Sequence, residues 1–256
     1  FNMAFSERWL DSAQLRSSIF SHAKELNYLP RSIRSAKAKV RVNFEASGES
    51  QPYVLQKGSQ FSTIVKSKSL TFTLPETLIL TSADTNFEFT TDIYEGIYVK
   101  DSYVMTEENQ KFKITNKNVD TRSISVTVFE DNQELGFTYK QTSSLLDLDN
   151  NSQAYFIQTS ETGNYELIFG DNVVGRMPKM GAIIVIDYRV SIGVEGNGAK
   201  SFSVDFDPTS SSELLSSPEL EVIEASANGD AAESNESIKY YAPRHYQVQE
   251  RTVTND

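Results

Sequence analysis

The chain contains no cysteine, only two histidines and no long hydrophobic run. Without cysteine, neither disulfides nor thiolate metal sites can form, which fits a reducing compartment or a particle assembled in one. His22 and His245 are far apart in the sequence, and nothing places either beside a nucleophile, as a catalytic dyad requires. The longest apolar run, Ala182–Ile186, is far shorter than the roughly 20 residues that span a bilayer. We therefore expect no membrane partner.

Positive charge is scarce and unevenly distributed. The 24 Lys and Arg residues are outnumbered by 35 Asp and Glu, giving a formal net charge of −11. Because phosphate binding needs clustered positive charge, a nucleic-acid partner is not expected. Basic residues crowd the first sixth of the chain, whereas Ser201–Ile238 contains nine acidic residues and no Lys or Arg. These segments are either two solvated surfaces or complementary ends through which one protomer attracts a neighbour.

The length of 256 residues suffices for one large domain or two to three small ones with a sizeable core. The sequence opens Phe1-Asn2-Met3, without an initiator Met or a signal peptide. We expect this sequence to be part of a longer protein.

The first element that we expect is a helix. Ser6 is a suitable N-cap for a helix over about Glu7–Asn27, and Pro30 ends it. Apolar residues recur near helical spacing along this segment. Either the helix packs on its own domain, or Trp9 and Phe20 dock on a partner.

Most of the remaining chain is predicted to form strands. Lys37–Glu45 alternates apolar and polar residues without error, as a half-buried strand does. Short strands separated by Asn, Asp, Gly and Ser clusters indicate antiparallel sheets of a sandwich or barrel-like kind, so the predicted class is α+β, mostly antiparallel β. The other expected strands are Gln60–Val65, Leu70–Leu74, Thr77–Thr81, Phe87–Thr90, Tyr94–Lys100, Lys111–Thr115, Ser123–Phe129, Gly136–Lys140, Ala154–Gln158, Tyr165–Phe169, Ala182–Val190 and Pro218–Ala227.

These elements predict three parts. Residues 1–92 would hold the N-terminal helix and a β layer of the core, and residues 93–162 an inserted, sandwich-like all-β domain. Residues 163–256 would form a glycine-rich β core followed by a C-terminal helix or extended segment. The expected helix covers Ala231–Tyr241 and breaks before Pro243.

Glycines punctuate the chain on both sides of the strand Ala182–Val190, where a side chain would hinder a reversal or a close backbone approach. We expect Asp171 to accept hydrogen bonds from the turn backbone. Arg176 is either a partner contact or an internal clamp on that turn. The residues assigned to structural turns are Gly170, Asp171, Asn172, Gly175, Arg176, Pro178, Gly181, Gly193, Gly196, Asn197 and Gly198.

Motifs that carry chemistry are not matched. The segment from Asp147 resembles a calcium loop, but Ser152 stands where the loop needs glycine and Gln158 where it needs glutamate, so a solvated turn is expected. The glycines of Gly193–Gly198 have the wrong spacing for a dinucleotide fingerprint. Three carboxylates near glycine turns leave a glycosidase pair conceivable: Asp171, Asp187 and Glu195. We predict no cofactor, no metal site and no catalytic residue.

Three blocks of residues resemble the baseplate J-like proteins of contractile-tailed phages. The first is Phe169-Gly170-Asp171-Asn172, Gly175-Arg176-Met177-Pro178, Gly181, Tyr188, Gly193 and Gly196-Asn197. The second is Glu233-Ser234, Ala242-Pro243-Arg244, Gln249, Arg251 and Val253-Thr254, and a weaker third is Leu26–Arg31 with Ala36. The blocks follow the family order over nearly the whole chain. Asn172 replaces the usual glycine, and Asn tolerates left-handed backbone angles better than most residues.

The resemblance implies a structural protein and not an enzyme. Such subunits self-associate, join other baseplate wedge proteins and form the ring around the hub that rearranges when the sheath contracts. The expected location is the tail baseplate of the virion, assembled in the host cytoplasm, and the chain would be the carboxy-terminal part of a longer wedge subunit. The expected contacts with a second copy or another wedge protein are Trp9, Phe20, Tyr240, Tyr241, Pro243, Arg244 and Arg251.

Two other functions stay open at this point. A tail-associated hydrolase acting on cell-wall glycan would need two carboxylates at a suitable separation in a cleft. A receptor- or carbohydrate-binding module would fit the abundant β-structure and the 12 tyrosines, provided that some aromatic residues form exposed platforms.

Overall fold

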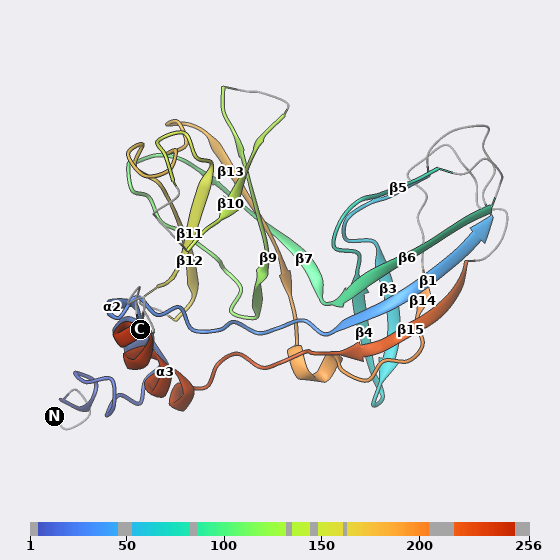
Figure 1. Cartoon of the computed structure of the whole chain (residues 1–256), viewed down its shortest axis with the longest axis horizontal. Helices are drawn as coiled ribbons and strands as arrows, with labels where there is room; N and C mark the ends of the chain where they lie inside the picture. The colour runs from blue at the N-terminus through green and yellow to red at the C-terminus, as the bar shows by residue number, and fades with distance from the viewer. Residues whose placement is uncertain are drawn as a thin grey trace, which may run out of the picture.

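Two β-sheets and a pair of helices build the α+β fold that the sequence predicts (Figure 1). The computed structural model describes residues 5–45, 53–81, 86–131, 135–143, 148–160, 163–204 and 218–248. The two sheets lie one after the other along the molecule, and the helices lie together at one end, beside the second sheet. No helix in these ranges is long and apolar enough to cross a membrane.

The first sheet has six strands in the order β14-β3-β4-β6-β1-β15. Strand β1 has the bounds that the sequence predicts, and its buried face carries Ala38, Val40, Val42 and Phe44. Apolar side chains from this face and from β3, β4 and β6 form one core. The strands are β1 (Lys37–Glu45), β3 (Gln60–Val65), β4 (Lys68–Thr73), β6 (Asn86–Glu95), β14 (Ser203–Val204) and β15 (Glu219–Ala227).

The second sheet has seven strands in the order β7-β13-β9-β10-β11-β12-β8 and surrounds a second core. All its pairings are antiparallel except the short parallel one between β10 and β11. The strands are β7 (Ile97–Val104), β8 (Phe112–Lys113), β9 (Val119–Phe129), β10 (Phe137–Gln141), β11 (Ala154–Thr159), β12 (Tyr165–Phe169) and β13 (Ile183–Val190). Strands β2 (Tyr53–Leu55) and β5 (Leu78–Leu80) form a separate antiparallel pair.

The sheets cut across the segment boundaries predicted at residues 92 and 162. Strands β12 and β13, expected in the glycine-rich core, pair within the second sheet, while β14 and β15 return to the first. The predicted strand Tyr94–Lys100 is wrong, because Gly96 interrupts it with a φ of +115°. A Cβ on Gly96 would lie only 2.2 Å from the carbonyl oxygen of Val190, so the chain leaves the first sheet beside the point where β13 ends.

Helix α2 covers Arg16–Glu25, so the prediction that it begins after Ser6 is wrong. Its N-cap residue, Leu15, makes no side-chain capping bond. The Glu7 carboxylate instead accepts hydrogen bonds from the backbone N–H of Gln14, at 2.9 Å, and of Leu15, at 3.3 Å. The preceding segment therefore folds back and satisfies these donors, which separates it from the helix.

Helix α3 covers Asn235–Val248, so the prediction of a helix over Ala231–Tyr241 that breaks before Pro243 is also wrong. Proline inside a helix removes one backbone hydrogen bond and crowds the preceding turn. Ile238 and Ala242 are fully buried in a core shared with α2, and this packing carries the helix past the proline. The Arg244 guanidinium donates a hydrogen bond of 2.6 Å to the carbonyl of Tyr240.

Candidate functional site

The turn after β12 is built as the sequence predicts. The Asp171 carboxylate accepts hydrogen bonds from the backbone N–H of Val174, at 2.9 Å, and of Val173, at 3.0 Å, and these two bonds lower its pKa. Asn172 has a left-handed φ of +66°, which confirms that asparagine can take the place of glycine there. A Cβ on Gly170 would lie 2.2 Å from the carbonyl oxygen of Gly175, so the two ends of the turn touch.

Arg176 is an internal clamp in this chain. Its Nη2 donates a hydrogen bond of 2.5 Å to the Glu130 carboxylate, which is only 2% exposed. The guanidinium also lies over the Phe137 ring, 4.8 Å from its centroid. The second Glu130 oxygen accepts from the backbone N–H of Lys179 at 3.2 Å. One buried carboxylate thus ties both ends of the segment 176–179 to the end of β9.

The second glycine cluster joins the two sheets. Gly193–Gly196 forms a 3₁₀ helix, η1, that begins with a φ of +66° at Gly193. A Cβ on Gly193 would lie 2.5 Å from the Asp230 carbonyl oxygen. The Asn197 side chain both donates to the carbonyl of Gly229, at 2.9 Å, and accepts from its N–H, at 2.8 Å. Glycine therefore permits close backbone approach here, which holds the connection to α3 against the first sheet.

The expected partner contacts are in different environments. Trp9, Tyr240 and Tyr241 are 66%, 53% and 52% exposed, and Figure 1 places the N-terminal segment and α3 at the same end of the molecule. Phe20 is 1% exposed and packs edge-on against Tyr165 within the chain, so it is not an exposed contact. The remaining three residues divide as follows: Arg244 is exposed and covers the Tyr240 ring, Pro243 is half-buried within α3, and Arg251 lies outside the described residues.

The three carboxylates considered for a glycosidase each have a separate structural partner. The Asp171 carboxylate accepts hydrogen bonds from its turn, and Glu195 forms an ion pair with Lys68. Asp187 Oδ2 forms an ion pair with Lys57 Nζ at 2.5 Å. The candidate calcium loop is a turn in its described part, residues 148–152: the Asp149 side chain accepts from Ser152 Oγ at 2.5 Å. Asp147 lies outside the described residues. Within the described ranges, no group of three or more His, Cys, Asp or Glu is placed to hold a metal ion.

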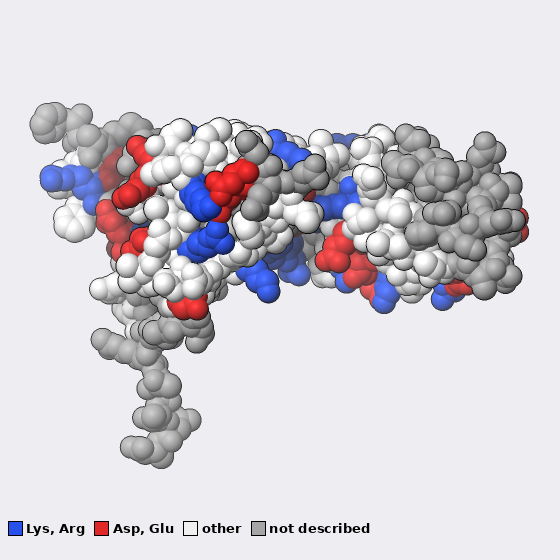
Figure 2. Space-filling model, turned by 90° about the horizontal axis from the view of Figure 1, so that it is seen from above, with Lys and Arg blue, Asp and Glu red and all other residues white. Residues whose placement is uncertain are grey.

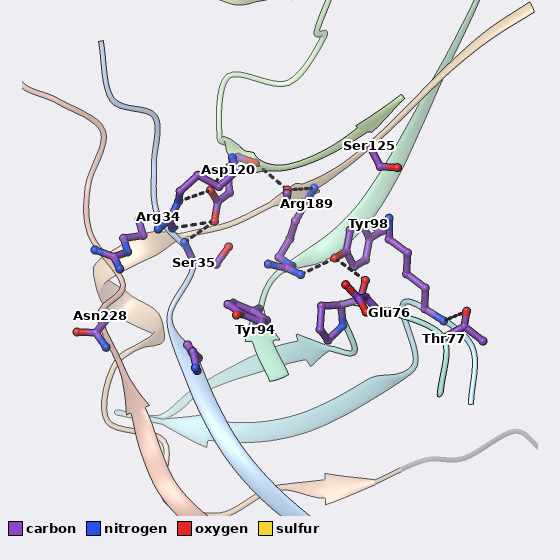
Figure 3. A pocket seen from close by; sticks show the side chains of 15 residues that line it. Arg34, Ser35, Glu76, Thr77, Tyr94, Tyr98, Asp120, Ser125, Arg189 and Asn228 are labelled. Carbon is purple, nitrogen blue, oxygen red and sulfur yellow. Dashed lines mark hydrogen bonds and ion pairs between the residues drawn. The ribbon is translucent and has the colours of Figure 1, made fainter. Parts of the chain in front are cut away.

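A cavity of about 740 Å³ lies where the two sheets meet (Figure 3). Strands β1 and β6 of the first sheet and β7, β9 and β13 of the second contribute to its walls. We call it the junction pocket. Its lining residues are Arg34, Ser35, Lys37, Lys57, Pro75, Glu76, Thr77, Tyr94, Tyr98, Asp120, Arg122, Ser123, Ser125, Arg189 and Asn228.

An irregularity in β13 places Arg189 in the junction pocket. Along β13, alternate residues up to Tyr188 face the second core, but Arg189 directly after it is also buried. The pairing of β13 with β9 shifts register between Asp187 and Arg189, and the Arg189 N–H donates to Ser123 Oγ at 2.8 Å instead of continuing the ladder. Bulges of this kind redirect side chains beside functional sites.

No protein-family model matches the chain. Baseplate wedge protein gp6 of Enterobacteria phage T4 is 24% identical over 221 residues, which cover 79% of this chain and 33% of the T4 protein. The chain thus spans about a third of the length of this curated relative. The similarity is distant and indicates a relation to baseplate wedge proteins, while membership of the baseplate J-like family stays a prediction.

In this distant relative of gp6, the oppositely charged segments meet within one chain. Arg41 Nη1 lies 3.0 Å from a Glu221 oxygen, because β1 and β15 are neighbours in the first sheet. Arg31 Nη1 lies 3.8 Å from an Asp230 carboxylate oxygen. Figure 2 shows basic and acidic side chains intermixed along one face. Two ion pairs thus join the basic and the acidic segment within the protomer.

Sequence reasoning missed Arg189 and the junction pocket. The residues that meet there come from positions 34 to 228, and their convergence depends on how the two sheets are joined. The one signal was a basic residue at the end of a strand that is otherwise mostly apolar, Ile183–Val190. A charged side chain in such a strand either reaches solvent or needs a buried partner.

Proposed function

We propose that this chain is a structural subunit of a phage tail baseplate wedge. The observation that carries the proposal is the 24% identity with baseplate wedge protein gp6 of phage T4 over 79% of this chain. Two sheets joined by close glycine contacts and a clamped turn provide a firm scaffold for such a role. Its place is the tail baseplate of the virion, and it acts by assembly and not by catalysis.

We further propose that the chain associates with a second copy and with other wedge proteins through its helical end, which we define as residues 5–30 and 235–248. Five large aromatic side chains there are more than half exposed, and two of them, Tyr240 and Tyr241, stack edge-on at 5.0 Å. Aromatic residues that are exposed in a free subunit are typical of interface cores. The five residues are Phe5, Trp9, Tyr240, Tyr241 and Tyr246.

The experiment combines sedimentation of the chain alone with co-purification of other wedge proteins from the same virus. We expect the unaltered chain to self-associate or to retain at least one wedge protein. The double substitution Tyr240→Ser and Tyr241→Ser should remove that association. The control is Ile64→Ser, which removes an apolar side chain that is 74% exposed on β3, away from the helical end.

Two outcomes would count against the proposal. A chain that stays monomeric and retains no wedge protein would remove the assembly role. Equal association of the tyrosine variant and the Ile64 control would leave the role intact but remove the helical end as the contact. Circular dichroism of each variant would establish that α3 is still folded.

A further inference from the structure

We propose that the junction pocket binds an oxyanion, a carboxylate or phosphate group, with Arg189 as its main ligand. The inference is independent of the baseplate role. Arg189 is 3% exposed and lines the cavity. Figure 3 shows Ser35, Tyr94 and Tyr98 grouped around its guanidinium.

Aromatic side chains fix the Arg189 guanidinium. It lies over the Tyr94 ring at 4.6 Å and over the Tyr98 ring at 4.8 Å from the centroids. Its Nη2 also donates a hydrogen bond of 2.5 Å to the Tyr98 hydroxyl. A guanidinium held in one plane presents its remaining N–H groups as a fixed fork, the geometry that carboxylate and phosphate oxygens accept.

The donors of this fork are incompletely satisfied. Arg189 Nε is buried and has no hydrogen-bond partner among the described residues, and the same holds for Ser35 Oγ in the pocket wall. Buried donors without a partner are rare in native proteins, so two of them in the wall of one cavity indicate an occupant that accepts hydrogen bonds.

The charge of the pocket selects an anion. Five lining residues are basic and two are acidic, which gives +3 in a chain of net charge −11. Counting Asp92 and Asp187 behind the lysines reduces this to +1. The two lysines and Arg122 are neutralised by these carboxylates and Asp120, whereas neither Arg34 nor Arg189 forms an ion pair with a described carboxylate. The remaining positive charge is thus carried by Arg34 and Arg189, and of these two Arg189 has the unsatisfied buried donor.

Glu95 interacts with Arg189 electrostatically but forms no ion pair with it. Its carboxylate is buried and accepts hydrogen bonds from Ser191 Oγ, at 2.5 Å, and from the backbone N–H of Ile192, at 3.1 Å. Burial raises its pKa, and these hydrogen bonds and the nearby Arg189 oppose that shift. An external oxyanion would pair with Arg189 without displacing this group.

The test is a titration of the chain at constant ionic strength, followed by the Arg189 Nε–H signal in the NMR spectrum. One arm uses inorganic phosphate and the other a short glutamate-rich peptide, with chloride as the reference anion. We expect a saturable shift in at least one arm, with a dissociation constant of about 1 mM or tighter. Binding of phosphate alone assigns a free anion, and binding of the peptide assigns a carboxylate on another chain.

Two variants test the assignment. Arg189→Lys keeps the charge but removes the fork, and it should weaken binding at least about tenfold. Ser35→Ala removes a hydroxyl that has no described partner, so it should weaken binding while leaving the melting temperature unchanged, even if the arginine variant fails to fold. The control is Arg41→Lys, at an exposed arginine on β1 that pairs with Glu88 and Glu221. The absence of a saturable shift, or equal binding by Ser35→Ala and the Arg41 control, would overturn the proposal.

Discussion

At the residue scale, glycines that no other residue can replace without strain lie where the two sheets are joined. Gly96 and Gly193 each combine a positive φ with a backbone carbonyl less than 3 Å from the place of a Cβ. Asn172 and Gly163 also have a positive φ, but a Cβ at Gly163 would meet nothing within 4 Å. The glycine pattern in the sequence singled out Gly193 but not Gly96, which lay inside the predicted strand Tyr94–Lys100.

Gly96→Ala should lower the free energy of unfolding by about 3 kcal/mol or more, because the methyl group would overlap the Val190 carbonyl in addition to straining φ. Gly163→Ala, which has the strain without the overlap, should cost only about 1 kcal/mol. Urea denaturation of both variants measures the difference. Equal losses would mean that the close approach at Gly96 contributes nothing.

Asp171 should make the stability of its turn depend on pH. Its folded-state pKa is lowered by the two backbone donors, so its contribution is present above the unfolded pKa of about 3.9 and is lost as pH falls through the lower folded value. Denaturation of the unaltered chain and of Asp171→Ala should therefore differ most at neutral pH and least at pH about 2. A difference that grows on acidification would contradict this assignment.

At the scale of elements, the sequence predicted best where burial alternates regularly. The bounds of β1, β3 and β12 agree with the prediction, and most other strands shift by a few residues. Strands β2 and β14, with three and two residues, are too short to show a period and were missed. The helices were misjudged because their ends depend on tertiary contacts: Glu7 folding back before α2, and packing against α2 that carries α3 past Pro243.

Phe20 should contribute to stability and not to association. Its ring is buried between the helices and β12, where it meets Tyr165, and Phe20→Ala should cost about 3–5 kcal/mol of unfolding free energy. Trp9→Ala, at an exposed site, should stay within about 0.5 kcal/mol. Thermal denaturation of the two variants distinguishes them, and a large loss at Trp9 with none at Phe20 would reverse the assignment.

The clamp between β9 and the glycine turn should behave as a buried ion pair. Arg176→Gln leaves the Glu130 carboxylate buried without its guanidinium and should cost about 3 kcal/mol. Adding Glu130→Gln removes that unpaired charge and should restore part of the loss. Denaturation of both single variants and the double variant completes the cycle. Strictly additive losses would show that the two side chains do not interact.

At the scale of the whole molecule, charge segregation along the sequence becomes charge pairing in space, as between Arg41 and Glu221. We therefore expect attraction between the basic segment of one copy and the acidic segment of another to contribute little to self-association. We expect the association constant of the chain to change less than about tenfold between about 0.05 M and 0.5 M salt, since screening acts on exposed charges and not on aromatic burial. Sedimentation at both salt concentrations measures it, and a steep loss at high salt would favour an electrostatic contact.

Because Gly96 lies against Val190, the chain passes from the first sheet into the second and returns from it at neighbouring points. The strands of the second sheet all lie between these two points in the sequence, so none of the strand pairings in the six-stranded first sheet involves them. The second sheet is thus an insertion in the chain of the first, and replacing it would leave the strand order of the first sheet unchanged. A replacement would still have to preserve side contacts with the rest of the chain, among them the seat of α2 on β11, the ion pair between Lys24 and Glu166, and the ion pair between Lys57 and Asp187.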